Sequence, residues 1–444
     1  MIRYLKRHKN VSKKLGLKNI PNQRTINYFI NNKLDKNTKE EIDFIVSKIN
    51  DISEKFGIIF DINLLEPEKP KQKKSKSSIE HKKNDITKEI GRYIKKRFSS
   101  ILDINLSHNT IYTKKDFIDL LLYMCKTTDF AENGSKTFKE ERKKVPNGDT
   151  LLYHLKNFKD VEQIKRIFTT INEMIWETAR KNNTFNSRRK YNCAIDFTEV
   201  FYYGNKNAPM VMDKKPERGA KCCYKYISLD IVEDGKRFTL MTLPFGHFDT
   251  KEQMLRKLLS YARQRIKIKT LLIDRGFFDS KSIQIFNNYH IKYIMPCSAN
   301  ERIKKILDLI PAPRVIKNYE MRNSRFNVVI VEDEYRIKRA FATNIDFNEN
   351  DVNISDRIFM MYGQRWGIET GYRVKKHSFR SKTTSKNYFI RLFYFLFSVL
   401  LYNLWILIDV LTWLSLYGKV SRFHLVTSKH FVTILINVNH KKDG

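Results

Sequence analysis

The 444-residue sequence has little cysteine, and its five cysteines form no pairing pattern. No two of them stand in the C-x-x-C spacing that zinc sites and thioredoxin-like redox motifs use. Their odd number also argues against a framework of disulfides. We therefore expect neither a disulfide-rich scaffold nor a zinc knuckle, and this cysteine usage suits a reducing cytoplasm. The cysteines are Cys125, Cys193, Cys222, Cys223 and Cys297.

Two sequence signals of other protein classes are also missing. No G-x-x-x-x-G-K-[ST] motif occurs, so an ATP-driven helicase is not expected. Residues 1–9 (MIRYLKRHK) are basic but lack the apolar run of a secretory signal. Together with the cysteines, the missing secretory signal leads us to expect a cytoplasmic protein.

Acidic residues are scarce beside basic ones. The sequence has 48 Asp and Glu against 84 Lys and Arg, a formal net charge of +36. A surface this positive repels itself unless it meets a polyanion, so we expect nucleic acid or an anionic membrane as partner. A genome-wide bias toward Lys and Asn is the alternative, although such a bias usually raises Glu alongside Lys. Apolar residues make up 41% of the chain, which excludes wholesale disorder.

The first part of the chain divides into a basic module and a linker. Residues 1–65 are rich in Lys and show two short helical patterns around Pro21, which predicts a basic helical DNA-binding module. The run EPEKPKQKKSK at 66–76 has two prolines, five lysines and no apolar residue. Such a segment cannot bury surface, so we predict a linker over 66–85.

Helical periodicity continues through residues 86–190. Thr113 and Asp116 have the spacing of a capping box before an apolar helix face. Asp149 is the expected N-cap of a later short helix. Helix, basic turn and capped short helix are compatible with a helix-turn-helix DNA reader. An ordinary helical bundle fits the same pattern, because helix-turn-helix spacing is a weak signal.

After residue 190 the pattern changes to strands. A short apolar strand around Asp196 precedes two strands that flank Asp234-Gly235, a strong hairpin signal. A helix capped by Asp249 and Glu252, a buried strand ending at Asp274, a short helix and a further strand follow. This order predicts an α/β fold, a mixed sheet with helices on its faces. We assign the core of this fold to 191–297 and 352–416, a β-rich insertion to 298–351 and a C-terminal tail to 417–444.

Two aspartates stand in apolar strands. A lone carboxylate there costs several kcal/mol to desolvate unless a cation or hydrogen-bond donors compensate it. If the strands of Asp196 and Asp274 are neighbours, the two carboxylates repel each other. Mg²⁺ would relieve this repulsion, since it prefers carboxylate oxygens. The alternative is that each aspartate only caps a strand end or begins a loop.

A third acid lies in a charged helix. Each residue of a helix is rotated by about 100° from the one before it, and this rotation places a single acid and several cations on one side of the helix. Such a face could ligate a metal while its cations bind phosphates. A solvated face held by i,i+4 ion pairs is the alternative. The residues on this side are Tyr362, Arg365, Glu369, Arg373 and Lys376.

These blocks resemble those of a known family. Asp196 in IDFT, Asp274 in LLIDRGF and the spacing Tyr362-x-x-Arg365-x-x-x-Glu369-x-x-x-x-x-x-Lys376 are similar to the three signature blocks of DDE transposases. More narrowly, they resemble the insertion-sequence group with a Tyr-Arg-Glu-Lys motif. One departure is Phe197, since relatives often have Gly directly after the first aspartate.

The resemblance implies a fold, an activity and a site. The fold would be RNase H-like, with a β-rich insertion before the glutamate helix and a basic all-α region in front of the core. The activity would be cleavage and transfer of DNA strands by in-line phosphoryl transfer. Asp196, Asp274 and Glu369 would hold two Mg²⁺ ions, for which Mn²⁺ would substitute. The phosphate-binding and supporting residues would be Tyr362, Arg365, Arg373, Lys376 and Arg275.

The expected partners are double-stranded DNA, as transposon ends and target, and a second copy of the chain, because two ends must be paired. An RNase H-like nuclease or resolvase would use the same acids. The segment 392–410 is long and apolar enough to span a bilayer, so a membrane-tethered nucleic-acid-binding protein is a further alternative. We prefer a buried core helix and no membrane, because such a sheet needs a final apolar helix.

Overall fold

The computed structural model divides the chain into two units, Met1–Ser75 and Lys76–Gly444. In the first unit the structure describes residues 25, 28, 33–35 and 37–42, and in the second it describes 76–438 except 103, 105, 107–109, 159, 186–188, 334, 349, 350 and 352. Residues 37–42 are helical, and the Asp35 carboxylate accepts a hydrogen bond from the Thr38 amide at 2.8 Å. Most of the predicted module at 1–65 lies outside the described residues, so its DNA-binding role stays a prediction.

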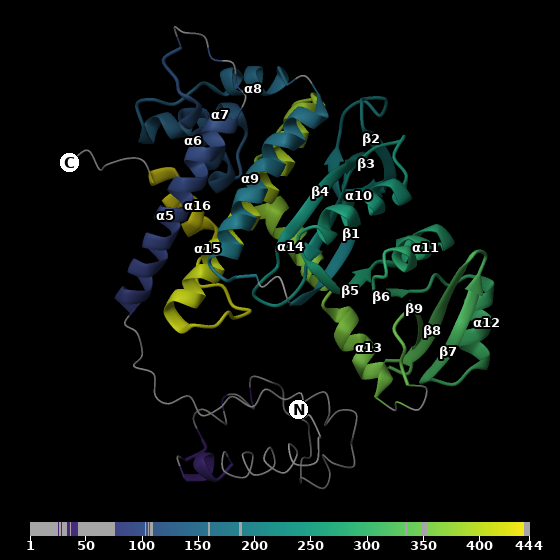
Figure 1. Ribbon diagram of the computed structural model, residues 1–444. Coiled ribbons are helices and arrows are strands. Elements are labelled where there is room, and N and C mark those ends of the chain that lie inside the picture. The colour runs from purple at the N-terminus through teal and green to yellow at the C-terminus, as the bar shows by residue number, and fades with distance from the viewer. Residues whose placement is uncertain are drawn as a thin grey trace. The chain divides into compact units, whose positions relative to one another are not determined.

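The second unit begins with a helical region (Figure 1). The Thr113–Asp116 capping box is confirmed, with the Thr113 amide donating to the Asp116 carboxylate at 2.7 Å. The predicted cap Asp149 is wrong, because its helix starts at Gly148 with Asn147 as N-cap. A Cβ at Gly148 would lie 2.6 Å from backbone atoms of Ala131, so this helix start packs tightly against the preceding helix. The helices are α5 Lys76–Ile101, α6 Lys114–Thr127, α7 Ala131–Glu141, α8 Gly148–Lys156 and α9 Val161–Lys181.

Helix α5 begins inside the range predicted as linker, 66–85. Its first turns have a single apolar residue, Ile79, but they have a partner elsewhere in the fold. Glu80 accepts a hydrogen bond from Lys83 at 3.2 Å, and His430 lies 3.2 Å from the Glu80 carboxylate and 3.1 Å from the Asn84 side chain. The linker boundary at 85 was placed too late because composition alone cannot reveal these long-range contacts.

One nine-stranded mixed sheet forms the centre of the second unit. Its strand order is β2-β3-β1-β5-β6-β9-β8-β7, and β4 pairs with β3. The β1–β5 and β5–β6 pairs are parallel, and the other pairs are antiparallel. The predicted mixed sheet is confirmed. The strands are β1 Lys190–Tyr202, β2 Val211–Glu217, β3 Ala220–Ile231, β4 Thr239–Phe245, β5 Lys267–Ile273, β6 Tyr293–Pro296, β7 Arg314–Met321, β8 Ser324–Glu332 and β9 Lys338–Thr343.

The predicted insertion at 298–351 is part of this same sheet. Its last strand, β9, pairs antiparallel with β6, so the strands of the insertion extend the core. Without them, β6 would leave an unpaired row of backbone groups at the sheet edge. The sequence shows the local hairpin but not its long-range partner.

Helices cover both faces of the sheet, as Figure 1 shows. Helix α10 contacts β3, β4 and β5, while α13 contacts β6 and β8. The α10 capping box uses Thr250 and Gln253, one residue beyond the predicted Asp249 and Glu252. The helical segments around the sheet are α10 Lys251–Arg263, η1 Arg275–Phe277, α11 Ser280–Asn288, α12 Glu301–Leu309, α13 Ile354–Gly363, α14 Trp366–Ser378, α15 Tyr388–Tyr417 and α16 Ser428–Asn437.

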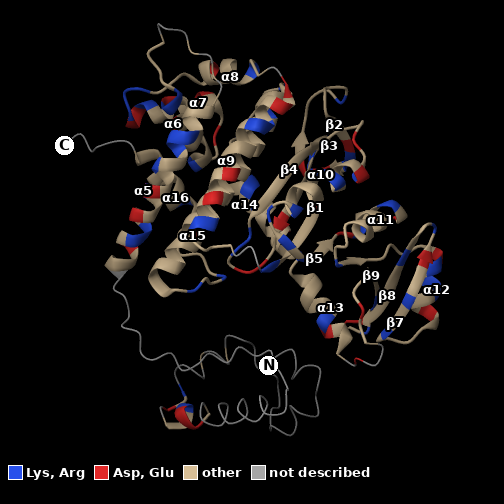
Figure 2. Ribbon diagram, viewed as in Figure 1, with Lys and Arg blue, Asp and Glu red and all other residues tan. Residues whose placement is uncertain are grey.

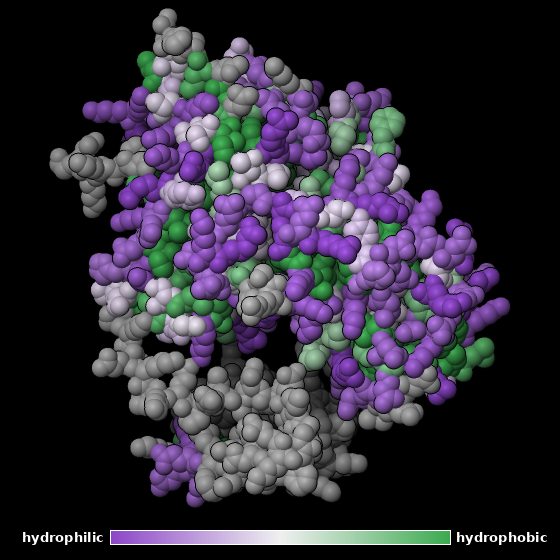
Figure 3. Space-filling model, in the orientation of Figure 1, coloured by the Kyte–Doolittle hydropathy of each residue, from purple (hydrophilic) through white to green (hydrophobic). Residues whose placement is uncertain are grey.

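Helix α15 is long and apolar enough to cross a membrane, but 94% of its most apolar window is buried inside the protein. It packs against α5, α8, α9, α14 and β4. The two most polar residues of its apolar segment 392–410 have partners: the Asn403 side chain bonds the amide and carbonyl of Thr239 at 2.9 and 2.7 Å, and Asp409 accepts from the Val426 amide at 2.9 Å. On the face seen in Figure 3, hydrophobic residues appear as separate patches among hydrophilic ones. The burial favours the predicted core helix.

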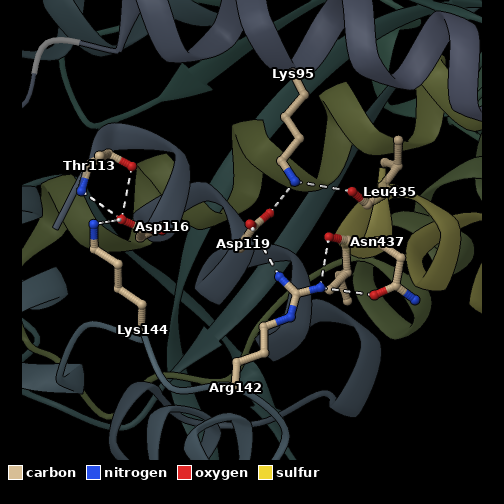
Figure 4. Close-up of polar contacts among 9 residues, drawn as sticks. Lys95, Thr113, Asp116, Asp119, Arg142, Lys144, Leu435 and Asn437 are labelled. Carbon is tan, nitrogen blue, oxygen red and sulfur yellow. Dashed lines mark hydrogen bonds and ion pairs between the residues drawn. The ribbon is translucent and has the colours of Figure 1, made fainter. Parts of the chain in front are cut away.

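The predicted C-terminal tail at 417–444 contains a packed helix, α16, which contacts α5 and α6. Figure 4 shows the polar contacts that hold it. Lys95 forms an ion pair with Asp119 and donates to the Leu435 carbonyl at 3.2 Å. Arg142 donates to the Asn437 side chain at 2.9 Å. The tail assignment is therefore wrong for α16, and the cause is again a set of contacts with residues far away in sequence.

Replacing Asn403 with Leu tests whether α15 is a core helix. The substitution makes the helix more apolar, which a membrane span would tolerate. In the described core it leaves the amide and carbonyl of Thr239 without partners, so we expect the free energy of unfolding to fall by about 2–4 kcal/mol. Urea denaturation of the detergent-free protein measures this change.

Ser398→Ala on the same helix is the matched control. The Ser398 hydroxyl donates only to the Phe395 carbonyl of its own helix, at 2.6 Å, so stability should change little. An Asn403→Leu variant as stable as the parent would contradict the core position of α15.

Candidate active site

The strand register places Asp196 and Asp274 side by side. β1 and β5 are parallel, and their last paired residues are Ile195 and Ile273. Asp196 is the next residue of β1, and Asp274 directly follows the end of β5 as the N-cap of η1. The two aspartates are therefore neighbours at the carboxyl end of the parallel pair. Side chains alternate along a strand. Both aspartates therefore belong to the face where Ala194 shares a core with α13 and α14.

The third acid comes from α14, and here one prediction needs correction. The residues from Tyr362 to Lys376 do not form one helix. Tyr362 lies in α13, Arg365 precedes α14, and Glu369, Arg373 and Lys376 lie in α14. Between the helices the Arg365 amide donates to the Tyr362 carbonyl at 2.9 Å, a tighter i→i−3 turn. Gly363 and Gly367 on either side weaken the helix there.

Arg365 joins two of the three acids. Its guanidinium lies 2.9 Å from the Asp196 carboxylate and 2.5 Å from the Glu369 carboxylate. The side chain is almost buried, with 8% of its surface exposed, and its charge lies 5.5 Å from the centre of the Tyr362 ring. The predicted residues Asp196, Glu369, Arg365 and Tyr362 therefore meet in one place.

The surroundings of Asp196 change its acidity. Burial is the main cause that raises the pKa of Asp196 to about 6; the charges of Asp274 and Glu369 contribute, while Arg365 opposes them. Burial raises the pKa of Tyr362 well above its usual range, so its hydroxyl stays protonated. Burial and the nearby charge of Arg380 lower the pKa of Lys376 to about 8.

A cavity of about 890 Å³ opens over these groups. All three acids line it together with Arg373 and Lys376. Among the described residues, no group of three His, Cys, Asp or Glu is already arranged to hold a metal ion. The guanidinium of Arg365 stands between Asp196 and Glu369 instead. Arg275 is exposed in η1 and is not one of the residues that line this cavity.

Two lysines in the cavity were missed from the sequence. Lys225 lies on β3 opposite Glu199 of β1, and its ammonium sits 4.4 Å from the centre of the Phe197 ring. Lys251 at the start of α10 donates to the Gly276 carbonyl at 3.0 Å and so holds the turn after Asp274. Neither lysine belongs to a sequence motif. Strand register brings Lys225 to the site, and helix packing brings Lys251 there. Figure 2 shows Lys and Arg spread over many elements, which makes single lysines hard to select.

A buried ion pair positions α14. Lys375 is 0% exposed, and its ammonium lies 2.8 Å from the buried Asp230 carboxylate on β3. The Tyr372 hydroxyl donates to the Asp196 carbonyl at 2.7 Å, and a Cβ at Gly371 would come within 3.2 Å of the Tyr402 hydroxyl. Breaking such a buried pair leaves an uncompensated charge, so this face of α14 is fixed on the sheet. The next face, with Glu369, is thereby directed to the cavity.

Two comparisons with known proteins found similarities to transposases. The family model described as transposase DDE domain matches residues 249–404, which include Asp274 and Glu369 but not Asp196. Among solved structures, the chain is similar to a cryo-EM structure of the piggyBac transposase in a synaptic complex with hairpin DNA. The TM-score is 0.50 at 13% identity, over 79% of this chain and 77% of that chain. No curated protein sequence matches the chain. The fold is thus similar to that of a transposase, and part of the chain matches a transposase DDE domain.

The raised pKa of Asp196 predicts a pH effect on stability. Its ordinary pKa is 3.8 and its folded pKa is about 6. The folded state keeps this proton more tightly, so the contribution to stability is present below about pH 4 and lost as the pH rises through about 6. In chelator, Asp196→Asn should gain on the order of 2–3 kcal/mol relative to the parent between pH 4 and pH 7.

Urea unfolding at a series of pH values measures the difference. Asp213→Asn, at an exposed position of β2, is the control and should show no such trend. A stability difference between Asp196→Asn and the parent that does not vary with pH would contradict the described burial of Asp196.

Proposed function

We propose that the protein is a DDE-type DNA transposase that binds transposon ends and cleaves and transfers DNA strands. The observation that carries this proposal is the meeting of Asp196, Asp274 and Glu369 in one cavity rimmed by Arg373 and Lys376. The match to the transposase DDE domain and the transposase-like fold support it. The Tyr-Arg-Glu-Lys spacing further favours the insertion-sequence group with that motif.

The three carboxylates would hold the divalent cations. Their donor set fits, because Mg²⁺ prefers carboxylate oxygens, and Mn²⁺ takes the same ligands. The electrostatics also fit. The charges of Asp274 and Glu369 raise the pKa of Asp196, and only the charge of Arg365 opposes them. When bound, two Mg²⁺ ions would supply an activated nucleophile and stabilise the leaving oxygen of an in-line displacement.

The cations of the chain would position the DNA. Lys376 and Arg373 would bind the phosphates beside the cleaved bond, because both line the cavity next to the acids. Arg365 now neutralises Asp196 and Glu369, so metal binding there would release its guanidinium toward a phosphate. Tyr362 would support Arg365 through the contact of its ring with the guanidinium. Arg275, which lies outside the cavity, would bind the DNA backbone that flanks the cleaved bond.

The remaining parts of the proposal follow from the requirements of transposition. The helical region at 86–190 and the basic module at 1–65 would recognise double-stranded DNA at the ends. Two copies of the chain would pair the two ends in the active complex, and the reaction would take place in the cytoplasm without a membrane.

Asp274→Asn and Lys376→Gln separate the chemistry from the binding. Asp274→Asn should spare binding of end DNA and lower strand cleavage by at least about a thousandfold, because a metal ligand is lost. Lys376→Gln should weaken binding and reduce the slope of log affinity against log salt by about 0.9, the contribution of one phosphate contact. Binding is measured by fluorescence anisotropy, and cleavage on gels with Mg²⁺.

Each variant serves as control for the other. Asp274→Asn keeps the size of the side chain, Lys376→Gln replaces it with a shorter polar one, and circular dichroism checks the fold of both variants. Loss of binding in Asp274→Asn, or unchanged cleavage, would argue against the metal-ligand role.

A further inference from the structure

A second cavity, of about 470 Å³, lies next to the acidic one. The two cavities share several lining residues, so they are continuous along the surface. The new one extends from Lys376 over the connection between α14 and α15. None of the sequence motifs above points to it. The shared residues are Glu199, Phe201, Glu217, Lys376 and His377.

Basic side chains outnumber acidic ones in its lining. They come from the turn after β2, from α14, from the α14–α15 connection and from the start of α15. Two carboxylates, Glu199 and Glu217, face them. Lys214 already lies 3.7 Å from the first and 2.8 Å from the second, so part of their charge is compensated. The basic residues are Arg218, Lys376, Arg380, Lys382 and Arg391.

Two of these cations are only incompletely compensated in the described part of the chain. The side chains of Lys376 and Arg380 form no hydrogen bond or direct ion pair with another described residue, although both are partly buried. The carboxylates of Glu199 and Glu217 act on the charge of Lys376 from a longer distance. Burial lowers the pKa of Arg380, and the charge of Arg391 lowers it further. Arg391 is held by the Ser385 carbonyl at 2.7 Å and by the Tyr202 ring. Cations that repel each other and are incompletely compensated form a site for an anion.

Aromatic rings stand beside these cations. Tyr203 is 69% exposed and Phe130 is 39% exposed, unusual for such large rings. Both line the cavity, and the Lys382 ammonium lies 5.9 Å from the centre of the Phe130 ring. Incompletely compensated cations beside exposed aromatic faces are the combination that binds single-stranded nucleic acid, since the cations bind phosphates and the rings stack on bases. A duplex keeps its bases stacked inside and offers none to these rings.

We propose that this cavity, named here the Arg380 pocket, binds a phosphate and a stacked base of a single-stranded DNA segment that leaves the acidic centre. The proposal rests on the proposed function, because strand cleavage at the acids is what would bring single-stranded DNA to this place. Arg380 binds the phosphate together with Lys376, and Tyr203 stacks on a base. The pocket therefore favours a DNA end with an unpaired strand over a blunt one.

The test compares two labelled DNAs with the full-length protein. One is a blunt duplex, and the other is the same duplex with a single-stranded extension. Anisotropy in EDTA prevents cleavage. Arg380→Gln and Tyr203→Ala should each weaken binding of the extended DNA by about tenfold and leave the blunt duplex within about twofold. The salt slope for the extended DNA should fall by about 0.7 in Arg380→Gln, the value for a single-strand phosphate.

Arg302→Gln is the matched control, because this exposed arginine of α12 lines neither cavity. If Arg380→Gln fails to fold, Tyr203→Ala decides, since its side chain lies mostly in solvent. If Arg380→Gln and Tyr203→Ala bind the extended DNA as tightly as the parent, or lose affinity equally for both DNAs, the proposed role of the Arg380 pocket is wrong.

Failure of the pocket and failure of the proposed function give different results. If the pocket is wrong but the function right, Asp274→Asn still abolishes cleavage while Tyr203→Ala binds both DNAs normally. If the function is wrong, cleavage persists in Asp274→Asn whatever the Tyr203 variant does.

Discussion

The mutual repulsion of three carboxylates is the constraint around which the site is built. Parallel pairing of β1 and β5 brings Asp196 beside Asp274, and α14 adds Glu369 above them. Without positive charge such a cluster would keep its protons or push α14 away. Arg365 supplies that charge at 2.9 and 2.5 Å, and the buried Lys375–Asp230 pair holds the helix on the sheet. The proposed chemistry uses the same negative charge to hold metal ions.

Much of this arrangement could be predicted from the sequence, because its signals are local. Apolar runs that end in Asp196 and Asp274 mark two buried strands, and the Asp234-Gly235 turn marks a hairpin. Helical spacing places Glu369 and Lys376 on one side of a helix, as the structure has them within α14. Resemblance to a family then related segments that lie far apart in the chain.

What the sequence missed depends on contacts between distant residues. β2 is mostly exposed and polar, so it has no strand pattern of its own and forms only as a partner of β3. The insertion at 298–351 was predicted as separate from the core, because the sequence around β9 does not reveal that this strand pairs with β6. The break between α13 and α14 and the ion pairs of Arg365 with Asp196 and Glu369 were missed. Helical periodicity assumes one continuous helix over 362–376. The Arg380 pocket combines residues from three parts of the chain.

The central claim is that the three acids together form a site for divalent cations, and titration of the protein with Mn²⁺ followed by electron paramagnetic resonance tests it most directly. The account predicts that the parent binds Mn²⁺ and that Asp196→Asn and Glu369→Gln each lose at least about tenfold in affinity, since each removes a charged ligand. Mn²⁺ binding that is unchanged in both variants, with the fold intact, would contradict it.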